Sequence, residues 1–278
     1  GFEVLREERV QTRLGSGLSG ILPRPAVADT VKAVHEFLTE VRKKHNPRVL
    51  AVATSAVREA TNRACLLDAL KRNGGVEVQV LSGPEEARLG ALAVLKTLSF
   101  RHGVIADLGG GSLQLTRVRS EEIVAVASLP LGAVRTTQRF LKHDPPTAPE
   151  LRALREEIRN RVSEVLPPRQ KDEEMVGLGG TVQALANMHL AACHKKPVSR
   201  QGLRLQQSHL TALRERLEVL PTRQRRLPGL KAERADIILA GAIVFEEIMI
   251  LGGYTTLTVC TGGVRQGILL RETFNGNG

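Results

Sequence analysis

The chain is poor in aromatic residues, and this scarcity limits the classes of molecule that it can bind. Among 278 residues there is no tryptophan, one tyrosine (Tyr254) and six phenylalanines. Proteins that bind single-stranded nucleic acid stack bases on aromatic side chains. The basic residues of this chain are also scattered rather than organised into a recognisable reading motif. We therefore predict no nucleic-acid partner.

Cysteine and long apolar runs are scarce as well. Cys65, Cys193 and Cys260 lie far apart and have no Cys-x-x-Cys or His-x-x-x-His spacing, which argues against a disulfide framework or a zinc site and favours a reducing compartment. No apolar stretch approaches the roughly 18 residues that a membrane span requires. The N-terminus lacks the layout of a signal peptide. These absences predict a cytoplasmic protein with no membrane partner.

What is abundant is positive charge. Lys and Arg number 40 against 29 Asp and Glu, which gives a formal charge of +11 and a sequence pI near 10.2. Such a balance favours a polyanionic partner or substrate, although solvated basic faces alone would explain much of it. The hydrophobic share of 42% is enough for one large domain or two of ordinary size.

The hydrophobic pattern predicts strands that alternate with helices, which is typical of an α/β layer on a largely parallel sheet. We expect strands at 2–13, 48–54 and 76–81, helices at 25–44 and 65–72, an antiparallel meander at 103–107, 113–119 and 123–129, and a charge-laced, solvated helix at 151–166. The change from βα units to hairpins places a domain boundary near residue 100.

One strand ends in a carboxylate and three glycines. Residues 105–115 read Ile-Ala-Asp-Leu-Gly-Gly-Gly-Ser-Leu-Gln-Leu, so that Asp107 stands just before Gly109, Gly110 and Gly111. Glycines let backbone N–H groups approach an anion closely, and a carboxylate can hold a hard cation such as Mg²⁺. The pattern therefore suits a phosphate and metal site, and it equally suits a tight hairpin turn.

Two further segments also combine an apolar strand with consecutive glycines. Residues 175–181 and 258–267 each read as a strand that enters a Gly-Gly turn and opens a helix, where the helix dipole and free N–H groups favour an anion. None of the three turns has the Gly-Lys-Ser/Thr ending of a P-loop or a clean Gly-x-Gly-x-x-Gly. The spacing therefore argues against a Walker or Rossmann site.

Charged residues follow two predicted strand ends. Ser82 and Glu85 have capping-box spacing, which explains Glu85 structurally. Glu86 has no such explanation: it is either a general base near the carboxyl end of a strand or a surface glutamate that complements the helix dipole. Arg58 is either a bidentate clamp on a phosphoryl group or an exposed helix arginine.

Together these motifs resemble the exopolyphosphatase / guanosine pentaphosphate phosphohydrolase (Ppx/GppA) family. The resemblance spans essentially the whole chain and is carried by seven collinear segments: 54–62, Ser-Gly-Pro-Glu-Glu-Ala-Arg at 82–88, Asp-Leu-Gly-Gly-Gly-Ser at 107–112, Pro-Leu-Gly-Ala-Val-Arg at 130–135, Gly-Leu-Gly-Gly-Thr at 177–181, Arg-Ala-Asp-Ile-Ile at 234–238 and Gly-Gly-Val-Arg-Gln-Gly at 262–267.

The resemblance implies membership of the actin-like ATPase superfamily. The fold would be α/β, with two ribonuclease-H-like domains and an active site in the cleft between them. We expect an N-terminal domain over residues 1–100 that is incomplete at its start, a C-terminal domain with added helices over 101–264, and a terminal helix at 265–278 that returns to the N-terminal domain. A homodimer is also implied.

Residue roles follow from the same resemblance. Glu86 matches the glutamate that orients and deprotonates the attacking water, Arg58 an arginine that binds the phosphoryl group, and Asp107 an aspartate that associates with Mg²⁺ or Mn²⁺. The phosphate-binding positions would be Gly109, Gly110, Gly111, Ser112, Gly179, Gly180, Thr181 and Arg265.

Three departures from the family pattern stand out. The family starts with a strand and an Asp-x-Gly-Ser-Asn turn, whereas this sequence begins with residues that resemble the following strand, so the first strand and phosphate loop are expected to be missing. Gln114 and Gln266 stand where glutamates are usual. The loss of these carboxylates would weaken divalent-metal binding.

The leading hypothesis is hydrolysis of the terminal phosphate of inorganic polyphosphate by water that Glu86 activates. The alternative substrate is guanosine pentaphosphate, which presents the same terminal phosphoanhydride. A non-catalytic module that binds polyphosphate or a nucleotide would explain the missing loop and the two glutamines. Sugar-kinase chemistry on the related fold is disfavoured by the segment that carries Glu86.

Overall fold

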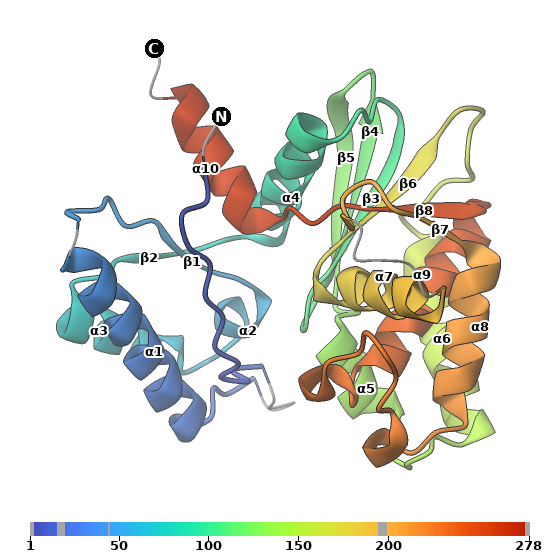
Figure 1. Ribbon diagram of the computed structural model, residues 1–278, viewed down its shortest axis with the longest axis horizontal. Helices are drawn as coiled ribbons and strands as arrows, with labels where there is room; N and C mark the ends of the chain where they lie inside the picture. The colour runs from blue at the N-terminus through green and yellow to red at the C-terminus, as the bar shows by residue number, and fades with distance from the viewer. Residues whose placement is uncertain (1–2, 16–19, 44, 194–198, 276–278) are drawn as a thin grey trace. The chain divides into compact units, whose positions relative to one another are not determined.

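The computed structural model describes residues 3–15, 20–43, 45–193 and 199–275, and Figure 1 shows its elements. The chain divides into two compact units, Gly1–Gly83 and Pro84–Gly278. The division lies at the start of a helix rather than near residue 100. In the described part of the chain, no helix is long and apolar enough to cross a membrane.

The first unit is a small α/β layer. Its elements are α1 (Arg24–Arg42), β1 (Ala51–Ala53), α2 (Ser55–Arg58), α3 (Arg63–Gly74) and β2 (Val78–Val80). β1 and β2 pair in parallel, and α1 packs beside α3. A cluster of apolar side chains, including Leu22, Val57, Leu66 and Leu70, forms its core.

The strand predicted at residues 2–13 is wrong for the described residues 3–13, which contain none. The physical reason is that a strand needs a backbone partner, whereas the sheet of this unit consists of β1 and β2 over the described residues. Val4 and Leu5 are accordingly exposed, with 59% and 81% of their surface accessible.

The second unit contains a six-stranded mixed sheet in the order β5-β4-β3-β6-β8-β7. The strands are β3 (Gly103–Leu108), β4 (Leu113–Arg119), β5 (Glu122–Leu129), β6 (Glu174–Leu178), β7 (Arg204–Gln206) and β8 (Thr256–Val259). β3, β6 and β8 run parallel, while β3, β4 and β5 form the predicted antiparallel meander.

Helices cover both faces of this sheet. The helices of this unit are α4 (Gly83–Thr97), α5 (Ala133–Phe140), α6 (Ala148–Ser163), α7 (Gly180–Ala192), α8 (Gln207–Glu218), α9 (Ile238–Gly252) and α10 (Val264–Asn275), with short 3₁₀ turns at Thr222–Gln224 and Ala232–Arg234. Residues of β3 alternate between the faces: Ile105 joins Ala91 and Val94 of α4, whereas Val104 and Ala106 join the larger cluster around α9.

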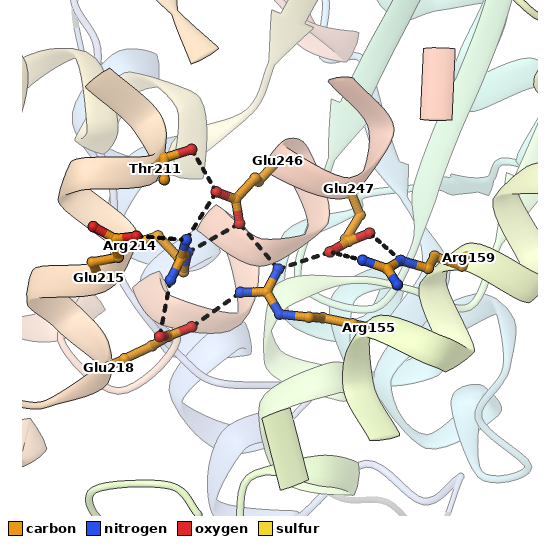
Figure 2. A network of polar contacts seen from close by, with 8 residues as sticks. All are labelled: Arg155, Arg159, Thr211, Arg214, Glu215, Glu218, Glu246 and Glu247. Atoms are coloured by element: carbon orange, nitrogen blue, oxygen red, sulfur yellow. Dashed lines mark hydrogen bonds and ion pairs between the residues drawn. The ribbon is translucent and has the colours of Figure 1, made fainter. Parts of the chain in front are cut away.

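A buried charge network ties α6, α8 and α9 together (Figure 2). Glu246 and Glu247 of α9 are almost inaccessible, at 2% and 0% exposed. Arg155 Nη1 of α6 donates to Glu247 Oε1 at 2.7 Å and to Glu246 Oε2 at 3.0 Å, and Arg214 Nε of α8 donates to Glu246 Oε2 at 3.0 Å. The charged face predicted to be solvated is therefore partly an internal contact.

Candidate active site

The first glycine turn joins β3 to β4 and is closed by a bond from Gly109 N to Ser112 O of 3.0 Å. Its carbonyl oxygens face the start of α5, because Ala133 N donates to Gly109 O and Val134 N to Gly110 O, both at 2.9 Å. Carbonyl oxygens repel an anion. Holding them on the α5 side therefore leaves the turn suited to bind a phosphate on the other side.

The chain that precedes α5 packs directly against this turn. A Cβ on Gly132 would lie 2.3 Å from Gly110 O, so only glycine allows this approach. Arg135 Nε donates to Gly111 O at 2.8 Å. The segment 130–135, to which the family resemblance gave no role, therefore supports the glycine turn.

Asp107 lies near the end of β3, wedged between two glycines. A Cβ on Gly90 of α4 would lie 3.2 Å from Asp107 Oδ2, and a Cβ on Gly179 would lie 3.2 Å from Asp107 Oδ1. Both carboxylate oxygens are thus approached closely by backbone. The side chain is half-buried at the edge of the second unit's core.

Glu86 acts on Asp107 electrostatically. Burial, and secondarily the charge of Glu86, raises the pKa of Asp107 to about 7 from the ordinary value of 3.8. Glu86 occupies the first turn of α4 and is itself only 7% exposed. Glu86 and Gly90 are four residues apart, so both lie on the face of α4 that meets Asp107. The structure therefore brings together two of the residues predicted from sequence.

The second glycine turn joins β6 to α7, as predicted. Gly179 has a φ of 94°, which favours glycine, and a Cβ there would lie 2.4 Å from Leu108 O. Thr181 is buried in the first turn of α7, and a Cβ on Gly241 of α9 would meet its side chain at 2.5 Å. The start of α7 is thus clamped between β3 and α9, with its N-terminal dipole near Asp107.

An arginine missed as a site residue lies at this second turn. A Cβ on Gly180 would lie 1.9 Å from Arg234 Nη2 and 2.4 Å from Arg234 Cζ, so the guanidinium rests on the backbone at the start of α7. Arg234 comes from the 3₁₀ turn Ala232–Arg234. Arg234 begins the segment 234–238 that carries part of the family resemblance, and its position just before an apolar helix is the sequence signal that could have identified it.

The third glycine turn follows β8 and opens α10. Cys260 N donates to Gly177 O at 2.9 Å, and Gln183 Nε2 donates to Thr261 O at 3.4 Å, so this turn lies beside the second. α10 packs closely on α4, since a Cβ on Gly267 would lie 2.0 Å from Leu89 O. Arg265 is exposed at the start of α10, and its phosphate-binding role stays a prediction.

Arg58 ends α2 in the first unit. Its Nη1 donates to Leu81 O at 2.8 Å, which fixes the half-buried guanidinium beside the chain that leaves β2. Glu86 and Asp107 belong to the second unit. A joint role of Arg58 with these carboxylates therefore stays a prediction.

The donor set suits Mg²⁺ better than a transition metal. The described residues hold no group of three or more His, Cys, Asp or Glu side chains able to bind a metal ion. Mg²⁺, however, commonly takes one or two carboxylates and completes its shell with water and substrate phosphates. Burial, and secondarily the charge of Glu86, raises the pKa of Asp107, and a divalent cation bound to the Asp107 carboxylate would favour its ionised form.

Comparison with known proteins agrees with this geometry. The sequence model described as the Ppx/GppA phosphatase family matches residues 1–275. The chain is 33% identical over 265 residues to Exopolyphosphatase 1 of Mycobacterium leprae, covering 91% of this chain and 76% of that protein. It is 33% identical over 285 residues to Exopolyphosphatase 2 of Mycobacterium tuberculosis, covering 96% and 88%.

Solved structures show the same fold. The crystal structure of the Aquifex aeolicus member of the Ppx/GppA family is 30% identical, with a TM-score of 0.81 over 96% of this chain and 88% of that one. An exopolyphosphatase from Cytophaga hutchinsonii, at 23% identity, has a TM-score of 0.83 over 95% and 88% of the two chains. The α/β fold predicted from sequence is thus confirmed.

Proposed function

Because the chain belongs to the Ppx/GppA phosphatase family, we propose that it is an exopolyphosphatase, which removes the terminal phosphate of inorganic polyphosphate by attack of water. Membership makes it a hydrolase of phosphoanhydride bonds. The observation that carries the finer proposal is the pair of carboxylates, Glu86 and Asp107, set among glycine turns. The similarity to two exopolyphosphatases supports it.

Glu86 is assigned as the general base. Glu86 lies in the first turn of α4, where the helix dipole stabilises negative charge. An ionised carboxylate can accept a proton from water as the water oxygen attacks the terminal phosphorus. The bond to the bridging oxygen breaks, and the polyphosphate chain leaves one phosphate shorter.

The glycine turns and arginines are assigned to the phosphates. Backbone N–H groups at Gly110–Ser112 and at the start of α7 would bind non-bridging oxygens, with Arg234 beside the second turn. The N–H of Gly109 closes the turn on Ser112 O and supports this loop rather than binding phosphate itself. Arg58 would hold the transferring group, because a guanidinium binds two phosphate oxygens at once. Asp107 would hold Mg²⁺, which when bound neutralises phosphate charge.

The net charge of +11 favours a long polyanion as substrate. Guanosine pentaphosphate presents the same terminal bond, but a purine is usually held by aromatic side chains, of which this chain has few. Competition decides between the two. We expect long-chain polyphosphate to inhibit any hydrolysis of guanosine pentaphosphate, and absence of inhibition would refute the preference for the polymer.

The deciding experiment is phosphate release from long-chain polyphosphate with and without Mg²⁺. We expect metal-dependent release by the wild type and a loss of 10²-fold or more in Glu86→Gln, the range typical of a general base. Glu85→Gln is a matched control, because Glu85 is exposed in the same helical turn and glutamine preserves a capping box.

Two outcomes would contradict the proposal. Full activity of Glu86→Gln would remove Glu86 from the role of base. Tight binding of polyphosphate by the wild type without turnover, under Mg²⁺ or Mn²⁺, would identify a binding module instead.

A further inference from the structure

β4 buries polar residues on one face beside the glycine turn. Ser112, which directly precedes β4, is 3% exposed, and Gln114 and Thr116 of β4 are each 1% exposed. Alternation along the strand places leucines on the opposite face, in the main core. Thr116 Oγ1 donates to Ala87 O of α4 at 3.5 Å. The polar row therefore lies on the α4 face of the sheet.

The same row borders the carboxylates. Gln114 is the residue directly opposite Asp107 in the antiparallel register of β3 and β4. Side chains of directly opposed residues project from the same face and lie close to one another. Gln114 is thus a neighbour of Asp107, on the face of the sheet that α4 and Glu86 cover.

Gln114 uses only its donor atoms. Its Nε2 donates to Ser112 Oγ at 2.7 Å and to Ser128 Oγ at 3.3 Å. Its Oε1 is buried and has no hydrogen-bond partner among the described residues. A buried acceptor without a partner costs free energy that a leucine or methionine would avoid, so the N–H group is what this side chain contributes.

The donated bond fixes the direction of the Ser112 hydroxyl. A hydroxyl oxygen that accepts from an amide keeps its own proton for a different acceptor. Ser112 is also the residue that closes the first glycine turn, through its carbonyl bond from Gly109. A carboxylate at position 114 would act in the opposite sense, because it can only accept and would draw that proton to itself.

We propose that Gln114 is a positioning residue that orients the Ser112 hydroxyl as a hydrogen-bond donor to a substrate phosphate in the first glycine turn. This inference rests on the proposed function, since it requires a phosphate in that turn. Gln114 acts on the substrate only through Ser112. Its effect must therefore vanish when the hydroxyl is absent.

A double-mutant cycle with Ser112→Ala and Gln114→Met tests this dependence. Methionine has nearly the shape of glutamine but donates no hydrogen bond. We expect Ser112→Ala to raise KM for polyphosphate about tenfold, as loss of a bond to a charged group does. Gln114→Met should raise KM several-fold alone and less than about twofold in the Ser112→Ala background, with kcat nearly unchanged throughout.

Three results would overturn the inference: an equal KM effect of Gln114→Met in both backgrounds, no KM effect in either, or a KM effect that follows a loss of stability in urea unfolding. Gln206→Met, an exposed change on β7, is the control for glutamine loss.

Binding of tripolyphosphate by calorimetry separates the inference from the proposed function. If the Kd values of the four proteins show the same dependence of Gln114→Met on Ser112, the inference is supported even when the wild type releases no phosphate. Absence of phosphate release would refute only the proposed hydrolysis. A wild type that binds no tripolyphosphate would overturn the inference.

Discussion

Asp107→Asn is predicted to stabilise the protein at pH 8 while abolishing metal-dependent hydrolysis. In the folded state the pKa of Asp107 is raised to about 7, against 3.8 for the ordinary group. The folded protein therefore binds the proton more tightly than the unfolded chain between these values. The stabilising contribution of the protonated Asp107 carboxyl is fully present below about pH 4. It decreases as the pH rises and is lost above about pH 7.

The magnitude follows from the shift. A displacement from 3.8 to about 7 corresponds to a penalty on the order of 4 kcal/mol above pH 7. Between pH 5 and pH 8 the wild type should lose about 3 kcal/mol relative to Asp107→Asn, because asparagine does not ionise. This is a large part of the roughly 5–15 kcal/mol that stabilises an ordinary domain.

The chain provides its own probe for the assay. Tyr254 is the one tyrosine, there is no tryptophan, and Tyr254 is buried in the second unit with Asp107. Urea unfolding followed by tyrosine fluorescence in EDTA, at pH 5 and pH 8, therefore reports on the unit that contains the carboxylate pair. Mg²⁺ should then stabilise the wild type and leave Asp107→Asn unchanged.

Asp172→Asn is the control, since Asp172 is exposed in a turn of the same unit and its loss should change stability by about 0.5 kcal/mol or less. A wild type that is equally stable at pH 5 and pH 8, or an Asp107→Asn variant that is less stable than the wild type at pH 8, would refute the reasoning.

Two further predictions concern the scaffold of the site. Glu247→Gln should lower the free energy of unfolding by about 3 kcal/mol, which is the low end for a broken buried pair because Arg159 is half exposed. Glu215→Gln removes an exposed carboxylate that pairs with Arg214 and should cost under about 1 kcal/mol, so equal losses of the two variants in urea unfolding would contradict the network's role. Gly132→Ala should cost about 1–3 kcal/mol, because its Cβ would lie 2.3 Å from Gly110 O and from Gly111 C, which are backbone atoms that cannot turn away. Gly263→Ala, whose Cβ meets nothing within 4 Å, should unfold at the same urea concentration as the wild type, and a neutral Gly132→Ala would show that the chain before α5 shifts freely away from the glycine turn.

The sequence by itself determined the local plan of the protein. The meander β3–β4–β5 and the strand-to-helix turns at Gly179 and Gly262 were predicted from alternation, apolar periodicity and glycine, because these are properties of neighbouring residues. The family was identified from seven segments that occur in the same order along the chain. The strand expected at 2–13 is absent from its described residues 3–13, because pairing, rather than local pattern, makes a strand.

Only the tertiary structure decided which of these residues meet. The sequence placed Glu86 and Asp107 on separate elements, and the packing of α4 on β3 gives the pair its shared burial and the raised pKa of Asp107. The sequence pattern predicted a solvated helix face that includes Arg155, but Arg155 bonds to Glu246, which lies 91 residues further along the chain. Arg234 likewise owes its place beside Gly180 to long-range packing. Contacts between distant segments depend on how whole helices cover the sheet, which no local pattern encodes.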